Sequence, residues 1–200
     1  TGQKLAVKFL RPGVEDRLRG ELELLARMAK WAERFFPITH RLRPLDAITT
    51  LARSINGETD FRMEAAALSE MAENTAQDKG FCVPDIIWEA SGRRVLTMSW
   101  VDGVSASDIE GLQKHGHDLS DLATRLLQIF LTLVLRDGFF HADMHQGNLL
   151  VQKDGTIVAI DLGICGRLDK DSRRFLAEIL HGFITRDYVK LAQVHIEAGY

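Results

Sequence analysis

The sequence has little of what marks secreted, membrane-spanning or nucleic-acid-binding proteins. Its 200 residues include two cysteines, Cys82 and Cys165, whose wide separation predicts reduced, buried thiols rather than a disulfide framework or a metal site. There is no opening signal peptide, and no apolar run reaches the roughly 18 residues that a membrane-spanning helix needs. The best candidate, 126–135, lies between Arg125 and Arg136 and is expected to be a buried helix. The formal net charge of −3 gives no electrostatic case for nucleic-acid binding.

What is present suits a globular protein with a sizeable core. The composition is 46% hydrophobic and 26% charged, and this length suits one domain with two lobes. The chain begins directly in an apolar alternation, as a fragment of a longer chain would. Residues 5–10 are predicted to form a strand and 15–36 a helix, since the apolar residues of 15–36 share one face. Asp46 is expected to cap a short helix to Ile55, with a break at Asn56-Gly57.

The rest of the chain alternates between helices and hairpins. A second inserted helix is predicted over 58–74, followed by an antiparallel hairpin of 83–89 with 95–100. The later elements are a helix over 119–137, a loop over 138–148, a hairpin of 149–152 with 157–160, and helices over 170–199. This order predicts an α+β, bilobal, kinase-like fold with a small mixed lobe, 1–102, and a larger, mainly helical lobe, 103–200. Residues 97–103 would form the hinge, and ligand sites favour such junctions.

Polar residues with a shared chemistry gather around the second hairpin. The loop HADMHQGN contains Asp143 and Asn148, and Asp161 follows the last strand of the hairpin. Carboxylate and amide oxygens suit Mg²⁺ that also holds phosphate oxygens. Asp143 could accept a proton from an attacking hydroxyl or orient it. A catalytic Asp, an Asn five residues later and an Asp-x-Gly after a short hairpin together predict phosphoryl transfer.

Two other interpretations of this loop fit less well. His141, Asp143 and His145 could be zinc ligands on one face of an extended segment, but no fourth ligand is evident. Zinc would also leave Asn148 and Asp161 unexplained. The loop could also be only a polar turn, in which the Asp and Asn side chains hydrogen-bond to the nearby backbone. These residues would then have no common function. His141 is therefore expected to be structural and bonded to the loop backbone.

A cation is expected opposite these oxygens. Lys8 lies in an apolar strand, where a kinase-like fold needs one lysine for the nucleotide phosphates. Such a lysine needs a carboxylate to hold it in place. Glu64, one turn inside its helix and beside Phe61 and Leu68, is the predicted partner.

At this point the sequence resembles the UbiB-type atypical kinases, which are associated with ubiquinone biosynthesis. The Glu-x-Asp of Glu58 and Asp60 is the most telling feature, because ordinary protein kinases lack it. The stretches that carry the resemblance appear in family order and span nearly the whole chain: AVKFLRPGV at 6–14, ETDFRMEAA at 58–66, MSWVDG at 98–103, HADMHQGNLL at 141–150 and IDLG at 160–163.

The resemblance implies a role for each matching residue. ATP and Mg²⁺ would be the cofactors. Glu58 and Asp60 would form a regulatory element that meets a lysine from an N-terminal extension. The site would comprise Lys8 on the ATP phosphates, Glu64 as its partner, Asp143 as the catalytic residue, Asn148 and Asp161 on the metal, Met98 as gatekeeper, and Ser99 and Val101 in the adenine-facing hinge.

This chain also departs from the family pattern. The family's Lys-x-Gly-Gln extension, its alanine-rich nucleotide loop and the first strands of the small lobe are expected upstream of Thr1, and the large lobe is expected to be truncated as well. Many relatives have proline where this chain has Met144 and Gln146, and an acid where it has Ser99. None of these differences removes a phosphate or metal ligand.

The expected function is an atypical kinase or ATPase that binds Mg·ATP and supports ubiquinone biosynthesis. Too few residues separate Asp161-Leu162-Gly163 from the helix near Lys170 for a peptide-docking segment, so the substrate or regulator would be a lipid or small molecule. The expected partners are ATP and a lipid or quinone precursor, with peripheral contact at the cytoplasmic side of a bacterial inner membrane. Two alternatives stay open: a small-molecule phosphotransferase of the choline or aminoglycoside type, and a catalytically silent nucleotide-sensing scaffold.

Overall fold

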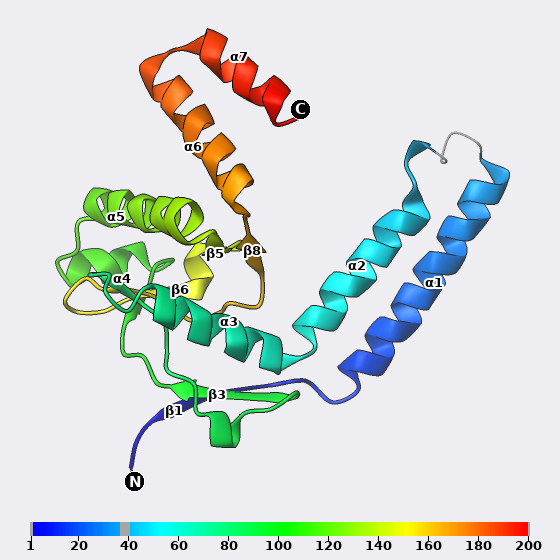
Figure 1. Cartoon of the computed structure of the whole chain (residues 1–200). Helices are drawn as coiled ribbons and strands as arrows, with labels where there is room; N and C mark the ends of the chain where they lie inside the picture. The colour runs from blue at the N-terminus through cyan, green and yellow to red at the C-terminus, as the bar shows by residue number, and fades with distance from the viewer. Residues whose placement is uncertain (1, 37–40, 200) are drawn as a thin grey trace. The chain divides into compact units, whose positions relative to one another are not determined.

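The computed structural model describes residues 2–36 and 41–199, apart from the side chains of residues 54 and 56–58. Two compact units divide the chain, one formed by residues 1–66 with 85–100 and the other by 67–84 with 101–200. Figure 1 shows their elements, including helix α3 (Phe61–Asn74), which begins in the first unit and ends in the second. The lobe boundary between residues 102 and 103 remains a prediction.

Two antiparallel strands form the sheet of the first unit. β1 (Leu5–Phe9) pairs with β3 (Val95–Ser99), with Lys8 opposite Leu96. The expected hairpin of 83–89 with 95–100 forms only in part: Ile86 makes an antiparallel bridge to Met98, and a 3₁₀ turn, η2 (Trp88–Ala90), then replaces the rest of the first strand. The reason is local, because the Ser91 hydroxyl accepts the backbone N–H of Thr97 at 2.9 Å in place of a partner strand.

Two long helices, α1 (Val14–Phe35) and α2 (Pro44–Glu58), lie side by side in the first unit (Figure 1). The predicted break at Asn56-Gly57 is wrong, since α2 continues to Glu58 and Asp46 lies in its first turn rather than at its cap. The chain breaks instead at Asp60, whose carboxylate accepts the backbone N–H of Arg62 at 3.1 Å. An aspartate that satisfies an unpaired N–H at a helix start is a stronger signal than a glycine in the last turn of a helix.

A four-stranded sheet lies at the centre of the second unit. Its order is β2 (Phe81–Cys82), β7 (Ile157–Ala159), β6 (Leu149–Val151) and β4 (Val104–Ser105). The predicted hairpin of β6 with β7 is confirmed, with Leu150 opposite Val158. Every residue of β7 is buried, so the hairpin belongs to the core of this unit. A separate antiparallel pair joins β5 (Phe139–His141) to β8 (Cys165–Arg167).

The other elements of the second unit are helical. They are α4 (Ile109–Lys114), α5 (Leu119–Thr132), the π-helical turn η3 (Leu133–Asp137), the 3₁₀ turn η4 (Gln146–Asn148), α6 (Lys170–Thr185) and α7 (Tyr188–Glu197). The predicted helices over 119–137 and 170–199 are confirmed. The expectation that 126–135 is buried holds only at Leu133 and Val134, because Leu127 is exposed. Neither cysteine forms a disulfide, and both are only half-buried. No helix in the described part of the chain is long and apolar enough to cross a bilayer.

Candidate functional site

In the first unit, Glu64 is the carboxylate that holds Lys8. Lys8 Nζ lies 2.6 Å from Glu64 Oε1, and the ammonium also lies 5.7 Å from the centre of the Phe61 ring. The Glu64 side chain is only 6% exposed, whereas that of Lys8 is 32% exposed. Because a buried carboxylate without a partner is costly, the pair fixes the lysine on its strand while part of the lysine side chain stays exposed. A contact of Lys8 with nucleotide stays a prediction.

The carboxylate of Asp60 is committed to Arg62 beside it. Arg62 donates from Nε at 2.9 Å and from Nη2 at 2.6 Å. These hydrogen bonds lower the pKa of Asp60 to about 2, so the residue is ionised at any physiological pH. The side chain of Glu58, the other half of the predicted Glu-x-Asp element, lies outside the described residues. The regulatory role of the element therefore remains a prediction.

The hinge residues predicted to face adenine occupy three different settings. Met98 is buried on β3 opposite Ala6 of β1. Ser99 exchanges two hydrogen bonds with the backbone of Asp85, at 2.8 Å and 3.0 Å. Val101 is half-buried and begins the part of the chain that belongs to the second unit. Their contact with adenine stays a prediction.

In the second unit, the candidate catalytic loop is built on a buried histidine. His141 ends β5 and is 1% exposed, and its Nδ1 lies 3.2 Å from the backbone nitrogen of Asp143 and 3.3 Å from the Ile164 carbonyl oxygen. Burial lowers the pKa of His141, and the nearby charges of Asp161 and Asp143 act in the opposite sense. The imidazole is therefore neutral at pH 7, and both carboxylates are close enough to influence it. This arrangement agrees with the structural role expected for His141.

Asn148 and Asp161 lie where the β6–β7 hairpin meets this loop. The Asn148 side-chain nitrogen donates to the Asp143 carbonyl at 3.2 Å, and its own backbone carbonyl accepts the N–H of Ile160 at 2.9 Å. Asp161 Oδ1 accepts the N–H of Gly163 at 3.0 Å. Since a Cβ at Gly163 would come within 3.2 Å of that oxygen, glycine lets the turn close on the carboxylate. The fold thus brings Asp143, Asn148 and Asp161 to one end of the hairpin.

This set of oxygens suits magnesium better than zinc. Among the side chains that the structure describes, no three from histidine, cysteine, aspartate or glutamate are grouped as a metal site. The two histidines of the zinc interpretation contact the loop backbone, since the His145 Nδ1 accepts the N–H of Gly147 and the buried His141 Nδ1 lies 3.3 Å from the Ile164 carbonyl oxygen, while His145 Nε2 lies 3.8 Å from Asp143 Oδ2. Mg²⁺ binds through one or two protein oxygens together with phosphate and water, which Asn148 and Asp161 could provide.

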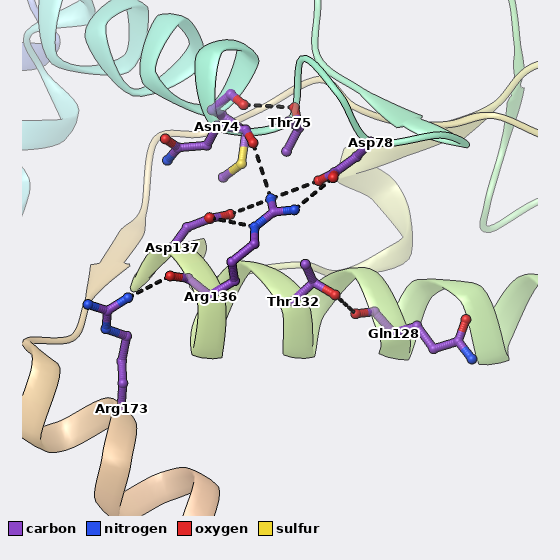
Figure 2. A network of polar contacts seen from close by, with 9 residues as sticks. Asn74, Thr75, Asp78, Gln128, Thr132, Arg136, Asp137 and Arg173 are labelled. Atoms are coloured by element: carbon purple, nitrogen blue, oxygen red, sulfur yellow. Dashed lines mark hydrogen bonds and ion pairs between the residues drawn. The ribbon is translucent and has the colours of Figure 1, made fainter.

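A polar network holds the chain where it enters the loop (Figure 2). Arg136 in η3 reaches Asp78 at 2.7 Å and Asp137 at 2.7 Å, and it donates to the Asn74 carbonyl at 3.1 Å. Arg173 of α6 in turn donates to the Arg136 carbonyl at 2.6 Å. The network joins the end of α3, the π-helical turn and α6. Sequence reasoning missed it, because it treated Arg136 only as the flank of an apolar run.

The two loop residues that depart from the family pattern face an apolar pocket. Met144 and Gln146 line a pocket of about 160 Å³ together with residues of α4, α5 and the β6–β7 hairpin. Leu122 and Leu149 are among its buried lining residues. The loop therefore has an apolar surface beside it as well as the buried imidazole of His141.

Comparisons with known proteins agree with this geometry. Residues 1–195 match the family described as the ABC1 atypical kinase-like domain. The whole chain is 35% identical to a "Probable protein kinase UbiB" of Aliivibrio salmonicida and 38% identical to one of Marinobacter nauticus, and it covers 38% and 37% of those proteins. A solved structure, the complex of Rv3197 with erythromycin from Mycobacterium tuberculosis, is similar with a TM-score of 0.77 and 25% identity, over 99% of this chain and 49% of that one. The resemblance to UbiB-type kinases and the predicted fold class are confirmed.

Proposed function

The chain belongs to the ABC1 atypical kinase-like family, and we propose that it binds Mg·ATP and acts as a phosphotransferase or ATPase that supports ubiquinone biosynthesis. The observation that carries the proposal is the gathering of Asp143, Asn148 and Asp161 at one end of the buried β6–β7 hairpin. Phosphoryl transfer needs positioning and charge neutralisation more than covalent help from the protein, so a small rigid set of oxygens suits it.

Each residue has a proposed task that its surroundings support. Asn148 and Asp161 hold Mg²⁺, which would neutralise charge on the phosphate oxygens when bound. Asp143 orients the attacking hydroxyl or water and accepts its proton. Lys8 contacts the phosphates, and its ion pair with the buried Glu64 fixes it for that task. His141, buried and neutral, positions the backbone of Asp143 rather than exchanging protons itself.

We further propose that the substrate or regulator is a lipid or small molecule, such as a quinone precursor, and not a peptide. After Asp161-Leu162-Gly163 the chain forms β8 and enters α6 at Lys170, which leaves no length for a peptide-docking segment. The chain spans less than two fifths of the curated relatives that it matches. The activity of the whole protein and its place on the cytoplasmic side of a bacterial inner membrane are therefore part of the proposal.

The test compares three carboxylates in the full-length protein. Mg·ATP should raise the melting temperature of the wild type, and Asp161→Asn should abolish that Mg²⁺-dependent rise. Asp143→Asn should keep nucleotide binding but lower turnover by about 100-fold or more, as expected for loss of a general base. Asp154→Asn changes a carboxylate in the β6–β7 turn that accepts the Thr156 N–H, and it serves as the matched control with unchanged binding and turnover.

Other outcomes would contradict the proposal. If Asp161→Asn kept full Mg·ATP stabilisation, the metal assignment would be wrong. Tight ATP binding by the wild type without ADP production would favour a nucleotide-sensing scaffold. Phosphorylation of a soluble metabolite hydroxyl in a substrate screen would favour the choline or aminoglycoside kinase type.

A further inference from the structure

Helix α1 exposes an apolar stripe that its own unit leaves uncovered. Leu24, Met28, Trp31 and Phe35 follow one another at spacings of four, three and four residues, and each side chain is more than half exposed. This spacing places them on one face of the helix. Of the 22 residues of α1, all of them described, only Ala29 is buried. Packing against α2 therefore does not account for the apolar content of this helix.

Aromatic rings gather at the end of the stripe. The Trp31 ring lies 5.2 Å from the Phe35 ring and 5.5 Å from the Phe36 ring, measured between centres. Leu42, shortly before α2 begins, is 74% exposed. An open apolar groove of about 620 Å³ lies between the two helices, lined by residues that include Met28, Trp31, Pro44 and Ile48. The apolar surface thus extends from α1 to the start of α2.

Basic residues accompany this apolar end. Arg27, Lys30 and Arg34 form a second stripe on α1, and Arg41 and Arg43 precede α2. Residues 27–46 contain these five basic residues and two acids, a net charge of +3, whereas residues 14–26 contain two basic and four acidic residues, a net charge of −2. Charge is therefore segregated along the α1–α2 hairpin.

The two acids at the basic end are already engaged. Glu33 accepts the backbone N–H of Leu45 at 3.3 Å, and Asp46 lies 3.0 Å from Arg43. The acids of the other end include Glu15, which Arg93 contacts at 2.7 Å. One of the five cations, Arg43, is paired with Asp46, and the net charge of +3 makes the aromatic end the part of the hairpin that favours an anionic partner.

We propose that this surface binds the face of an anionic lipid bilayer. We call it the aromatic–basic surface, and it consists of Leu24, Arg27, Met28, Lys30, Trp31, Arg34, Phe35, Phe36, Arg41, Leu42 and Arg43. An amphipathic helix with aromatic residues on one stripe and Lys and Arg on the next lies flat in the headgroup region. Its rings reach the acyl boundary, and its cations contact anionic headgroups.

A bilayer fits this surface better than the other possible occupants. A second copy of the chain would bring two clusters of five basic residues together, which like-charge repulsion opposes. An acidic protein would satisfy the charges. A bilayer, however, can contact both stripes at once. When the helix lies parallel to the membrane, its apolar stripe reaches the acyl boundary and its basic stripe contacts the headgroups. The proposal localises the membrane contact, and it needs no nucleotide, so it can hold or fail independently of Mg·ATP binding.

The experiment places an environment-sensitive fluorophore on α1 of the full-length protein, in a background without other accessible cysteines. Phe35→Cys carries the probe on the aromatic–basic surface, and Arg19→Cys carries it at the acidic end of the same helix. With vesicles of phosphatidylcholine and phosphatidylglycerol, the probe at position 35 should shift to the blue and be quenched by brominated lipid. The probe at position 19 should show neither change. Vesicles of phosphatidylcholine alone should give at least a tenfold weaker response.

Charge reversal provides the second measurement. Arg27→Glu, Lys30→Glu and Arg34→Glu together should weaken the response of the position-35 probe by at least tenfold. Arg17→Glu with Arg19→Glu, at the other end of α1, should leave it unchanged. Equal responses at positions 35 and 19, or no dependence on phosphatidylglycerol, would overturn the proposal. So would concentration-dependent self-association that the Trp31→Ala change abolishes, which would assign the surface to a second copy.

Discussion

The β6–β7 hairpin and the α1–α2 hairpin use large apolar side chains in opposite ways. In the strand hairpin, Leu149 and Val158 are fully enclosed, and the polar residues Asn148 and Asp161 lie at its end. In the helical hairpin, Met28 and Trp31 project outward. The first arrangement fixes polar atoms for chemistry, because a close-packed core holds its edges in place. The second leaves apolar area available for a partner.

The largest change in the free energy of unfolding is expected in the buried β6–β7 hairpin. Leu149→Ala should lower the free energy of unfolding by about 2–5 kcal/mol, because it removes a buried side chain and leaves a cavity under the loop. The cost follows from the 1% exposure of Leu149. Chemical denaturation of the wild type and the variant measures it. A loss below about 1 kcal/mol would mean that the hairpin is not the rigid support described here.

A smaller effect, dependent on pH, is expected at the histidine under the loop. Burial lowers the pKa of His141 in the native state. Below the ordinary histidine pKa of about 6.5, the unfolded chain therefore binds more protons at this residue than the native chain does. Acidification below that value therefore lowers the free energy of unfolding, and this residue contributes at most about 1.4 kcal/mol per pH unit. The loss begins at the unfolded pKa and stops once the pH falls below the native one.

His141→Gln tests this contribution because glutamine does not titrate. Urea unfolding at pH 7.5 and pH 5.0 should show the wild type losing more stability on acidification than the variant. Identical slopes for the wild type and His141→Gln would show that the buried imidazole does not resist protonation.

The sequence predicted those parts of the fold that depend on short-range patterns. The β6–β7 hairpin, α1 and the pairing of Lys8 with a carboxylate on α3 followed from alternation, periodicity and the need of a cation for a partner. Asp143, Asn148 and Asp161 were predicted as site residues from their spacing around a hairpin, and their roles stay a prediction. Local hydrogen bonds that compete with these patterns were misjudged. Asp60 accepts an N–H at the start of a helix, and the Ser91 hydroxyl accepts the N–H of Thr97 where a partner strand was expected.

Long-range polar contacts could not be predicted from a single sequence. Arg136 contacts Asp78, which is 58 residues away, and no local pattern indicates that arginine at the end of a helix will find this acid. The solvent exposure of the apolar residues of α1 could not be predicted either. The periodicity of the helix is the same whether these residues contact α2 or solvent. Only the packing of the helices shows that the residues of the stripe through Trp31 stay more than half exposed beside α2.

The smallest change in the free energy of unfolding is expected at the exposed stripe of α1. This result tests the contrast between the buried β6–β7 hairpin and the exposed α1–α2 hairpin. Trp31→Ala should change the free energy of unfolding by less than about 0.5 kcal/mol, as surface substitutions usually do, because the side chain is 58% exposed and contacts only Phe35 and Phe36 among aromatic rings in the described part of the chain. Thermal and urea unfolding in the absence of lipid measure this change, and Leu149→Ala provides the contrast. A loss of several kcal/mol would show that Trp31 packs into a core of the full-length protein. The stripe would then be covered by protein, and the bilayer could not contact it.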